Sequence, residues 1–242
     1  MENNMTAKGI FITGTDTGVG KSIASAAIAM LLKRKGHSVG VMKPVTSGCT
    51  ERDGHLVSED AELLCFAAGV PVTPDCAPYL LKAPLAPSMA ASLQGVRIDF
   101  QVIRDAYLRL AEKFDYVIVE GAGGLMVPLA GGLLISDLAC HLGLPIAVVA
   151  RAGLGTINHT LLTTFSGRNL GLEVKGVIVN RYPDLPDQAE AYAPHLISSL
   201  SGSLLLGVFP EVQGADDRRV VEGVVALLEQ DPATEIMLRE MF

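Results

Sequence analysis

The sequence has little of what a membrane, disulfide-rich or nucleic-acid-binding protein needs. No apolar run approaches the roughly 18 to 20 residues that cross a bilayer, so we expect no membrane partner. The four cysteines contain no C-x-x-C pair and no metal-ligand spacing, which favours reduced thiols over a disulfide or a zinc site. The 19 basic residues are outnumbered by 26 acidic ones, and the net charge of −7 argues against a nucleic-acid partner.

The N-terminal residues MENNMTAKG also lack the basic and then apolar order of a secretion signal. Together with the reduced thiols, this predicts a cytoplasmic protein. What the chain does contain is apolar material, because 49% of its 242 residues are hydrophobic and only 19% are charged. This composition supports a sizeable core and opposes disorder. No low-complexity linker divides the chain, so we expect a single α/β domain over residues 1–242.

Short apolar runs rich in β-branched residues alternate with longer helical patterns. Strands are predicted at residues 10–13, 38–42, 116–120, 146–150, 176–180 and 204–208. Helices are predicted at residues 21–35, 59–68, 99–112, 157–170, 188–200 and 218–229. Several strands are apolar on consecutive residues, as in a parallel sheet covered on both faces. The alternation predicts a mostly parallel β-sheet flanked by helices on both faces. Residues 70–95, rich in proline and alanine, are expected to be an irregular excursion.

The first predicted strand leads into GTDTGVGKS, residues 14–22, which is one residue longer than the usual phosphate loop G-x-x-x-x-G-K-[ST]. A phosphate loop needs backbone N–H groups turned inward and a helix N-terminus aimed at the anion. Gly18 and Gly20 supply unusual backbone positions, Lys21 would reach the terminal phosphates, and the Ser22 hydroxyl would bind Mg²⁺. The alternative is a glycine turn before a helix with a solvated lysine. The order of strand, loop, Gly-Lys-Ser and helix favours the phosphate loop.

Ligands of parallel sheets bind beyond the carboxyl ends of the strands, so the residues after the other strands are further candidates. Lys43 and Ser47 follow the second strand, where a lysine is either a surface residue or a cation that neutralises an anionic intermediate. Asp60, in the first turn of a helix, either favours the helix dipole or binds Mg²⁺. Glu120 precedes a run of glycines at the end of a buried strand, where an unpartnered carboxylate would be costly. We interpret it as a second metal ligand.

Asn180 ends a later strand, where its amide suits the edge of a nucleobase. The guanine signature N-K-x-D is absent there, which argues against a GTP switch. Taken together, the segments GTDTGVGKS, KPVTSG, SEDA, VEGAGGLMVPL, GLGTINHTLLT and VIVN resemble those of the dethiobiotin synthetase family in order and spacing. The resemblance runs from about residue 9 to residue 210. It implies a P-loop NTPase fold, ATP as co-substrate, Mg²⁺ as cofactor and a homodimer.

The reaction that the resemblance implies belongs to biotin biosynthesis. CO2 or bicarbonate adds to one amine of 7,8-diaminopelargonic acid to give a carbamate. The γ-phosphate of ATP moves to the carbamate and forms a carbamic-phosphoric anhydride. The second amine then closes the ring, releasing dethiobiotin and phosphate, with ADP as the other product. Little covalent chemistry falls to such a protein, which has to position reactants and stabilise phosphoryl charge.

The resemblance also assigns residues to these steps. Lys21 and Lys43 are implied as the catalytic pair beside the transferring phosphoryl group, and Mg²⁺ would be held by Ser22, Asp60 and Glu120. The nucleotide contacts would be Gly18, Val19, Gly20, Lys21, Ser22, Asp60, Glu120, Asn180 and a turn formed by Val208, Phe209 and Pro210. The substrate contacts would be Thr17, Lys43, Ser47 and a turn formed by Gly121, Ala122 and Gly123, joined by Asn158 and Tyr192 from a partner subunit.

Two positions depart from related patterns. Proteins of the MinD and ParA kind carry a second lysine where this chain has Asp16, which disfavours a regulatory switch ATPase. Many synthetases carry an acid or amide where this chain has Gly18, so the choice between ATP and another nucleoside triphosphate stays open. A metallochaperone ATPase would need a Cys or His cluster that the sequence lacks. The nearest enzymatic alternative is a ligase of the cobyrinic acid diamide synthase type, whose glutaminase domain we do not expect here.

Overall fold

The structure, a computed structural model, describes residues 7–242. Its centre is a six-stranded sheet in the order β12-β11-β10-β1-β7-β2, and each neighbouring pair of strands is parallel. This confirms the predicted parallel α/β architecture and all six predicted strands. The strands are β1 (Lys8–Gly14), β2 (Val39–Met42), β7 (Tyr116–Gly124), β10 (Ile146–Arg151), β11 (Val174–Tyr182) and β12 (Leu204–Pro210).

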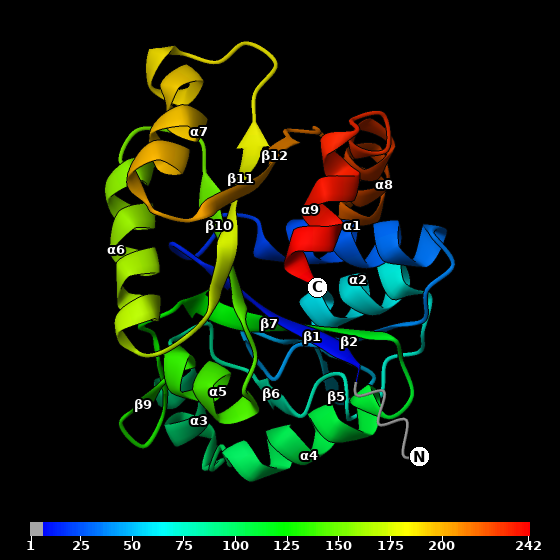
Figure 1. Ribbon diagram of the computed structural model, residues 1–242. Helices are drawn as coiled ribbons and strands as arrows, with labels where there is room; N and C mark the ends of the chain where they lie inside the picture. The colour runs from blue at the N-terminus through cyan, green and yellow to red at the C-terminus, as the bar shows by residue number, and fades with distance from the viewer. Residues whose placement is uncertain (1–6) are drawn as a thin grey trace, which may run out of the picture.

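Helices cover both faces of the sheet (Figure 1). One group packs around the first helix: α1 (Lys21–Arg34), α2 (Glu59–Ala68), α8 (Asp217–Leu228) and α9 (Ala233–Met241). The other group comprises α4 (Phe100–Ala111), α5 (Ile135–Leu142), α6 (Thr156–Asn169) and α7 (Gln188–Leu200). Within the sheet, the chain runs toward one edge from β1 to β2 and toward the other edge from β7 to β12. Because the crossovers between parallel strands are right-handed, connections that run in opposite directions place their helices on opposite faces. All six predicted helices are confirmed, whereas α5 and α9 were not predicted.

The core positions the start of α1. Ile10, Phe11 and Ile12 of β1 are completely buried in the middle of the sheet. Almost every residue of α1 between Ile23 and Leu32 is buried as well, since α2 and α8 cover the side that faces away from the sheet. Its small alanines allow this close packing. The loop between β1 and α1 is therefore held at both ends by the most buried elements of the protein.

Residues 70–95 are not the irregular excursion that the composition predicted. They contain β6 (Tyr79–Leu81), which pairs in parallel with β3 (Val45–Ser47), and the helix α3 (Pro87–Gln94). A strand of three residues is too short to show a period in the sequence, and Pro87 opens the helix where proline is tolerated. The remaining strands form two short hairpins, β4 (Thr50–Arg52) with β5 (His55–Val57) and β8 (Pro128–Ala130) with β9 (Leu133–Leu134).

Two predicted turns are wrong as well. β7 continues through Gly124 instead of ending at Glu120, and β12 continues through Pro210 instead of turning at residues 208–210. In each case pairing with a neighbouring strand extends the element, since Gly124 of β7 pairs with Gly14 and Pro210 of β12 pairs with Tyr182. For residues 7–242, none of the helices has the length and apolar content of a membrane span.

Candidate active site

The predicted phosphate loop lies between β1 and the N-terminus of α1. Gly20 caps α1 with φ at 83°, and a Cβ atom there would collide with the side-chain amide of Asn180. A left-handed backbone and a close approach both require glycine at this position. α1 has no side-chain cap and no acidic residue in its first turn. The first backbone N–H groups of α1 therefore have no side-chain acceptor in residues 7–242 and are able to bind an anion.

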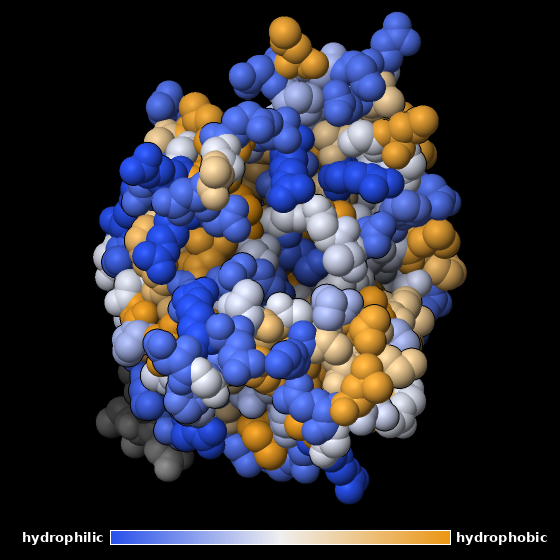
Figure 2. Space-filling view, turned by 180° about the vertical axis from the view of Figure 1, so that it is seen from behind, coloured by the Kyte–Doolittle hydropathy of each residue, from blue (hydrophilic) through white to orange (hydrophobic). Residues whose placement is uncertain are grey.

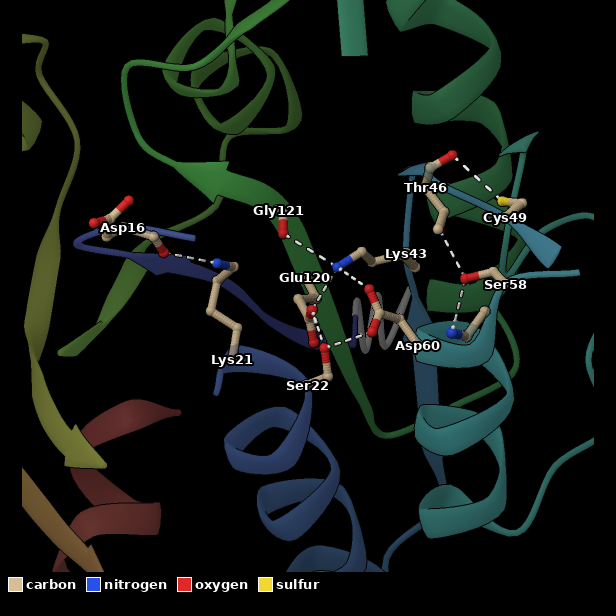
Figure 3. Close-up of polar contacts among 11 residues, drawn as sticks. Asp16, Lys21, Ser22, Lys43, Thr46, Cys49, Ser58, Asp60, Glu120 and Gly121 are labelled. Carbon is tan, nitrogen blue, oxygen red and sulfur yellow. Dashed lines mark hydrogen bonds and ion pairs between the residues drawn. The ribbon is translucent and has the colours of Figure 1, made fainter. Parts of the chain in front are cut away.

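A cluster of polar side chains from four elements meets beside this loop (Figure 3). The ammonium of Lys43, just after β2, lies 2.5 Å from Glu120 Oε1 and 2.8 Å from Asp60 Oδ2. The hydroxyl of Ser22 lies 2.9 Å from Asp60 Oδ1 and 2.8 Å from Glu120 Oε1. Glu120 is completely buried, and its other oxygen, Oε2, has no hydrogen-bond partner within the described part of the chain. The cluster thus contains a buried carboxylate oxygen that is still able to bind a cation.

Burial affects the two lysines differently. Lys21 is only 7% exposed, and desolvation lowers its pKa to about 8, more than the attraction of Glu120 raises it. Burial also opposes the charge of Lys43, but Glu120 and Asp60 outweigh that effect and raise its pKa above the ordinary value. Lys43 is therefore a cation held by two carboxylates. Lys21 donates instead to the backbone carbonyl of Asp16 at 3.2 Å, and a phosphate would give its ammonium a stronger partner.

The position of Asp60 depends on the cap of α2. The Ser58 hydroxyl accepts from the backbone N–H of Ala61 at 3.0 Å and starts the helix, as serine does at N-caps. It also lies 2.7 Å from the hydroxyl of Thr46, which follows Lys43 by three residues. This contact ties α2 to the segment after β2. As a result, Lys43 and Asp60 are held together by a neighbouring pair of hydroxyl groups.

The cluster opens into a cleft of about 780 Å³, a size typical of small-molecule sites. Figure 2 shows one face of the molecule, on which hydrophilic side chains surround a hollow near the centre. Eleven of the sequence-predicted site residues line the cleft: Thr17, Gly18, Gly20, Lys21, Ser22, Lys43, Ser47, Asp60, Glu120, Ala122 and Gly123. Segments that are far apart in the sequence therefore converge where the strands end.

The other predicted site residues do not line the cleft. They are Val19, Gly121, Asn158, Asn180, Tyr192, Val208, Phe209 and Pro210. The carbonyl of Gly121 still lies 3.5 Å from the ammonium of Lys43. Asn158 and Tyr192 are exposed on α6 and α7. The amide nitrogen of Asn180 donates to the carbonyls of Val19 and Gly20, at 3.0 Å each, beneath the loop. Its buried oxygen, Oδ1, has no partner among the described residues.

Several residues that line the cleft were missed by the sequence analysis. Pro84, Leu85, Ala86 and Pro87 come from the segment that was expected to be irregular. Arg181 and Asp217 come from the end of β11 and the start of α8. Arg181 stands directly after Asn180 at a strand end, so its position alone would have marked it as a candidate.

The fold and the loop define a protein of the P-loop nucleotide-binding class. Solved structures with a similar fold include MinD from Pyrococcus horikoshii complexed with Mg-ADP, with a TM-score of 0.55 and 16% identity over 97% of this chain and 94% of that one. A ParA family ATPase from Chlorobium tepidum gives a TM-score of 0.56 and 14% identity over 97% of both chains. These similarities show the fold alone.

The sequence comparisons are more specific. The model of the family AAA_26, described as an AAA domain, matches residues 8–230. The ATP-dependent dethiobiotin synthetase of Bacillus subtilis (strain 168) is 39% identical over 90% of this chain and 93% of its own length. That of Methanococcus vannielii is 44% identical over 73% and 80%, respectively. The chain belongs to the ATP-dependent dethiobiotin synthetase family.

Proposed function

We propose that this protein makes dethiobiotin from ATP, CO2 and 7,8-diaminopelargonic acid. Its relatives are named as ATP-dependent dethiobiotin synthetases. The observation that carries the proposal is the meeting of Lys21, Lys43, Asp60 and Glu120 at one cleft beside a phosphate loop. Two cations and two carboxylates suit a reaction that transfers a phosphoryl group from ATP to a carbamate, because negative charge has to be stabilised during the transfer. The carbamate and the carbamic-phosphoric anhydride are the intermediates of this proposal.

The chemistry of the cluster fits Mg²⁺. Ser22, Asp60 and Glu120 offer one hydroxyl and two carboxylates, which are the hard oxygen ligands that this ion prefers alongside phosphate oxygens and water. The unpartnered Oε2 of buried Glu120 supports the assignment, because such an oxygen is costly without a partner. When bound, Mg²⁺ would neutralise charge on the phosphates of ATP. Lys43, held against both carboxylates, would then face the carbamate side of the transferring group.

The substrate side of the cleft adjoins Thr17. The position of a Cβ atom on Gly123 lies 3.4 Å from the Thr17 hydroxyl, so the end of β7 and the phosphate loop meet there. The buried hydroxyl of Ser47 has no partner among residues 7–242. An amine or a carbamate of the substrate would satisfy it. On this basis we assign Thr17, Ser47 and residues 121–123 to the diamine and its carbamate, and Asn180 Oδ1 to the base of the nucleotide.

A direct assay tests this function. Phosphate release from ATP, Mg²⁺ and bicarbonate is measured with and without 7,8-diaminopelargonic acid, and the product is identified by mass. We expect release that depends on the diamine and a product with the mass of dethiobiotin, because the phosphoryl acceptor forms only from the diamine. Release that ignores the diamine would instead support a switch ATPase. Replacing ATP by other nucleoside triphosphates in the same assay determines which nucleotide the open space at Gly18 admits.

We also propose that the active enzyme is a homodimer in which Asn158 and Tyr192 complete the partner's substrate site. Tyr192 is 64% exposed, and the nearby apolar side chains Leu154 and Phe165 are 86% and 64% exposed. Figure 2 shows hydrophobic side chains gathered on the side that carries α6 in Figure 1. Exposed apolar residues of this kind suit an interface between subunits.

Mixing two inactive variants tests the shared site. Lys21→Ala lacks the nucleotide lysine, and the double variant Asn158→Ala, Tyr192→Ala lacks the side chains offered to the partner. In a twofold dimer, random mixing makes half of the dimers mixed, and each of these has one complete site, so about one quarter of the parent activity should return. The matched control mixes Lys21→Ala with itself. Full activity of the double variant alone would place Asn158 and Tyr192 outside the substrate site, and absence of any regain on mixing would show that they do not serve the partner's site.

A further inference from the structure

The end of β11 contains a bulge whose form the nucleotide-binding assignments do not explain. From Val179 to Tyr182, β11 advances three residues, while its partner β12 advances two, from Val208 to Pro210. Bulges are rare between parallel strands and often re-aim side chains beside functional sites. At this bulge Arg181 has φ at 54°, a left-handed conformation that is unfavourable for a residue with a Cβ atom.

The strained conformation at Arg181 differs from an ordinary turn. Within residues 7–242, the other non-glycine residue with positive φ is Asp53, which lies in the tight Asp-Gly turn between β4 and β5. Asp-Gly is a preferred sequence for such a turn, so the conformation of Asp53 follows from its local position. Arg181 is not in a turn between strands. Its backbone is held by the surrounding structure, which points to a role for the side chain.

The bulge directs two consecutive side chains at the same loop. In a regular strand, Asn180 and Arg181 would point to opposite faces of the sheet. Here the Asn180 amide donates to the carbonyls of Val19 and Gly20, and Nη1 of Arg181 donates to the carbonyl of Gly18 at 3.1 Å. Three consecutive carbonyls of the phosphate loop are therefore bound by two consecutive residues of β11.

Binding these carbonyls orients the N–H groups of the loop. A peptide group is planar, with its C=O and N–H pointing in opposite directions. A carbonyl held against β11 therefore turns the N–H of the following residue away from β11, and a phosphate bound on that side would accept a hydrogen bond from it. The contacts at Gly18, Val19 and Gly20 orient in this way the N–H groups of Val19, Gly20 and Lys21.

A charge contact does not account for Arg181. Among residues 7–242, no acidic side chain forms an ion pair with its guanidinium, although Asp217 lines the same cleft. Its hydrogen bond to the Gly18 carbonyl is the polar contact that the structure gives it. An arginine hydrogen bond to an uncharged backbone carbonyl of the loop suits the role of holding that loop in place.

We propose that Asn180 and Arg181 form a clamp that holds the phosphate loop ready for a nucleotide, with Arg181 as a positioning residue. This inference rests on the proposed function only in requiring that the loop binds a nucleoside diphosphate or triphosphate. The strained backbone at Arg181 costs free energy in the folded protein. That cost is offset when a nucleotide binds, because the loop does not have to reorganise around the phosphates. The clamp contributes to nucleotide affinity and leaves the phosphoryl transfer itself to Lys21 and Lys43.

Arg181→Gly tests the clamp, because glycine accepts the left-handed backbone and lacks the guanidinium. Binding of Mg·ADP is measured by calorimetry, which needs no diamine and no turnover. We expect affinity to fall by about tenfold, because a loop released from the clamp has to be ordered before it binds the phosphates. The melting temperature without nucleotide should change little, because relief of the left-handed backbone offsets the lost hydrogen bond. Amide hydrogen exchange at residues 18–21 should become faster in the nucleotide-free protein.

Further variants make the result decisive. Arg181→Asn also tolerates the left-handed backbone but is too short to reach the loop, so it should behave like Arg181→Gly and serves if that variant does not fold. Arg181→Lys retains the charge and a donor and should restore part of the affinity. Arg97→Gly makes the same change at an exposed position outside the cleft and should alter nothing.

Two outcomes would overturn the clamp. Unchanged Mg·ADP affinity in Arg181→Gly and Arg181→Asn would show that the loop does not need the contact. Weaker affinity with unchanged hydrogen exchange would show that Arg181 acts by its charge on the nucleotide. A failure of the proposed function would give a different result. The parent protein would then bind Mg·ADP but show no activity that depends on the diamine.

Discussion

Lys21→Ala should reduce turnover to less than about one-thousandth of the parent, the scale expected when a preorganised charge is removed from a phosphoryl-transfer site. Lys21 is 7% exposed, and within residues 7–242 its ammonium forms a hydrogen bond with a loop carbonyl alone, so nothing else in the cluster takes its place beside the phosphates. The fold should remain intact. Because burial lowers the pKa of Lys21 to about 8, Lys21 stays charged at neutral pH but its charge destabilises the folded protein relative to the unfolded chain. Removing it should leave the melting temperature unchanged or raise it.

The control for Lys21→Ala is Lys113→Ala, which removes a lysine from the surface beyond α4 and should keep full activity. Undiminished turnover in Lys21→Ala would rule out the phosphate-loop assignment. The lowered pKa adds a second readout. As pH rises through 8, the free protein loses the proton of Lys21, and bound phosphate favours its return. Mg·ADP binding near pH 8.5 should therefore weaken and take up a proton, and Lys21→Arg should abolish both effects because arginine stays charged.

Lys43→Ala should lower kcat by about 10²- to 10³-fold, the effect of removing one group that stabilises charge in the transition state. The Lys43 ammonium contacts Glu120 and Asp60 and lines the cleft beside the phosphate loop. Under the proposed function it would meet the carbamate as the carbamate receives the phosphoryl group. Steady-state kinetics with ATP and the diamine varied in turn check this. A change confined to KM would assign Lys43 to uniform binding of substrate instead.

Stability has to be separated from catalysis in this variant. Without Lys43, the hydroxyl of Ser22 is the hydrogen-bond partner that buried Glu120 retains among residues 7–242, and breaking a buried ion pair costs about 3–5 kcal/mol. The melting temperature of Lys43→Ala should therefore fall. The double variant Lys43→Met, Glu120→Gln removes both charges and should recover much of the stability while remaining inactive. Recovery of activity in the double variant would contradict a catalytic role for Lys43.

The local patterns of the sequence were enough to predict the main elements and the phosphate loop. Runs such as residues 116–120 and 146–150 are apolar on consecutive positions, and this property belongs to the strand itself. The Gly-Lys-Ser motif between a strand and a helix is equally local. β6 and α3 were not predicted, because elements of this length show no clear period in the sequence. The ends of β7 and β12 were predicted too early, because pairing with neighbours extends these strands.

By itself, then, the sequence determined the strands of the main sheet, the six longer helices, the phosphate loop and the family to which the chain belongs. Only the tertiary structure decided how the site is assembled. Ser22 and Glu120 are 98 residues apart, and they meet because β7 pairs with β1 and places Glu120 opposite Ile12. The conformation of Arg181 likewise depends on a bulge against β12. Strand order and register arise from the packing of distant segments, and a local sequence pattern does not specify that packing.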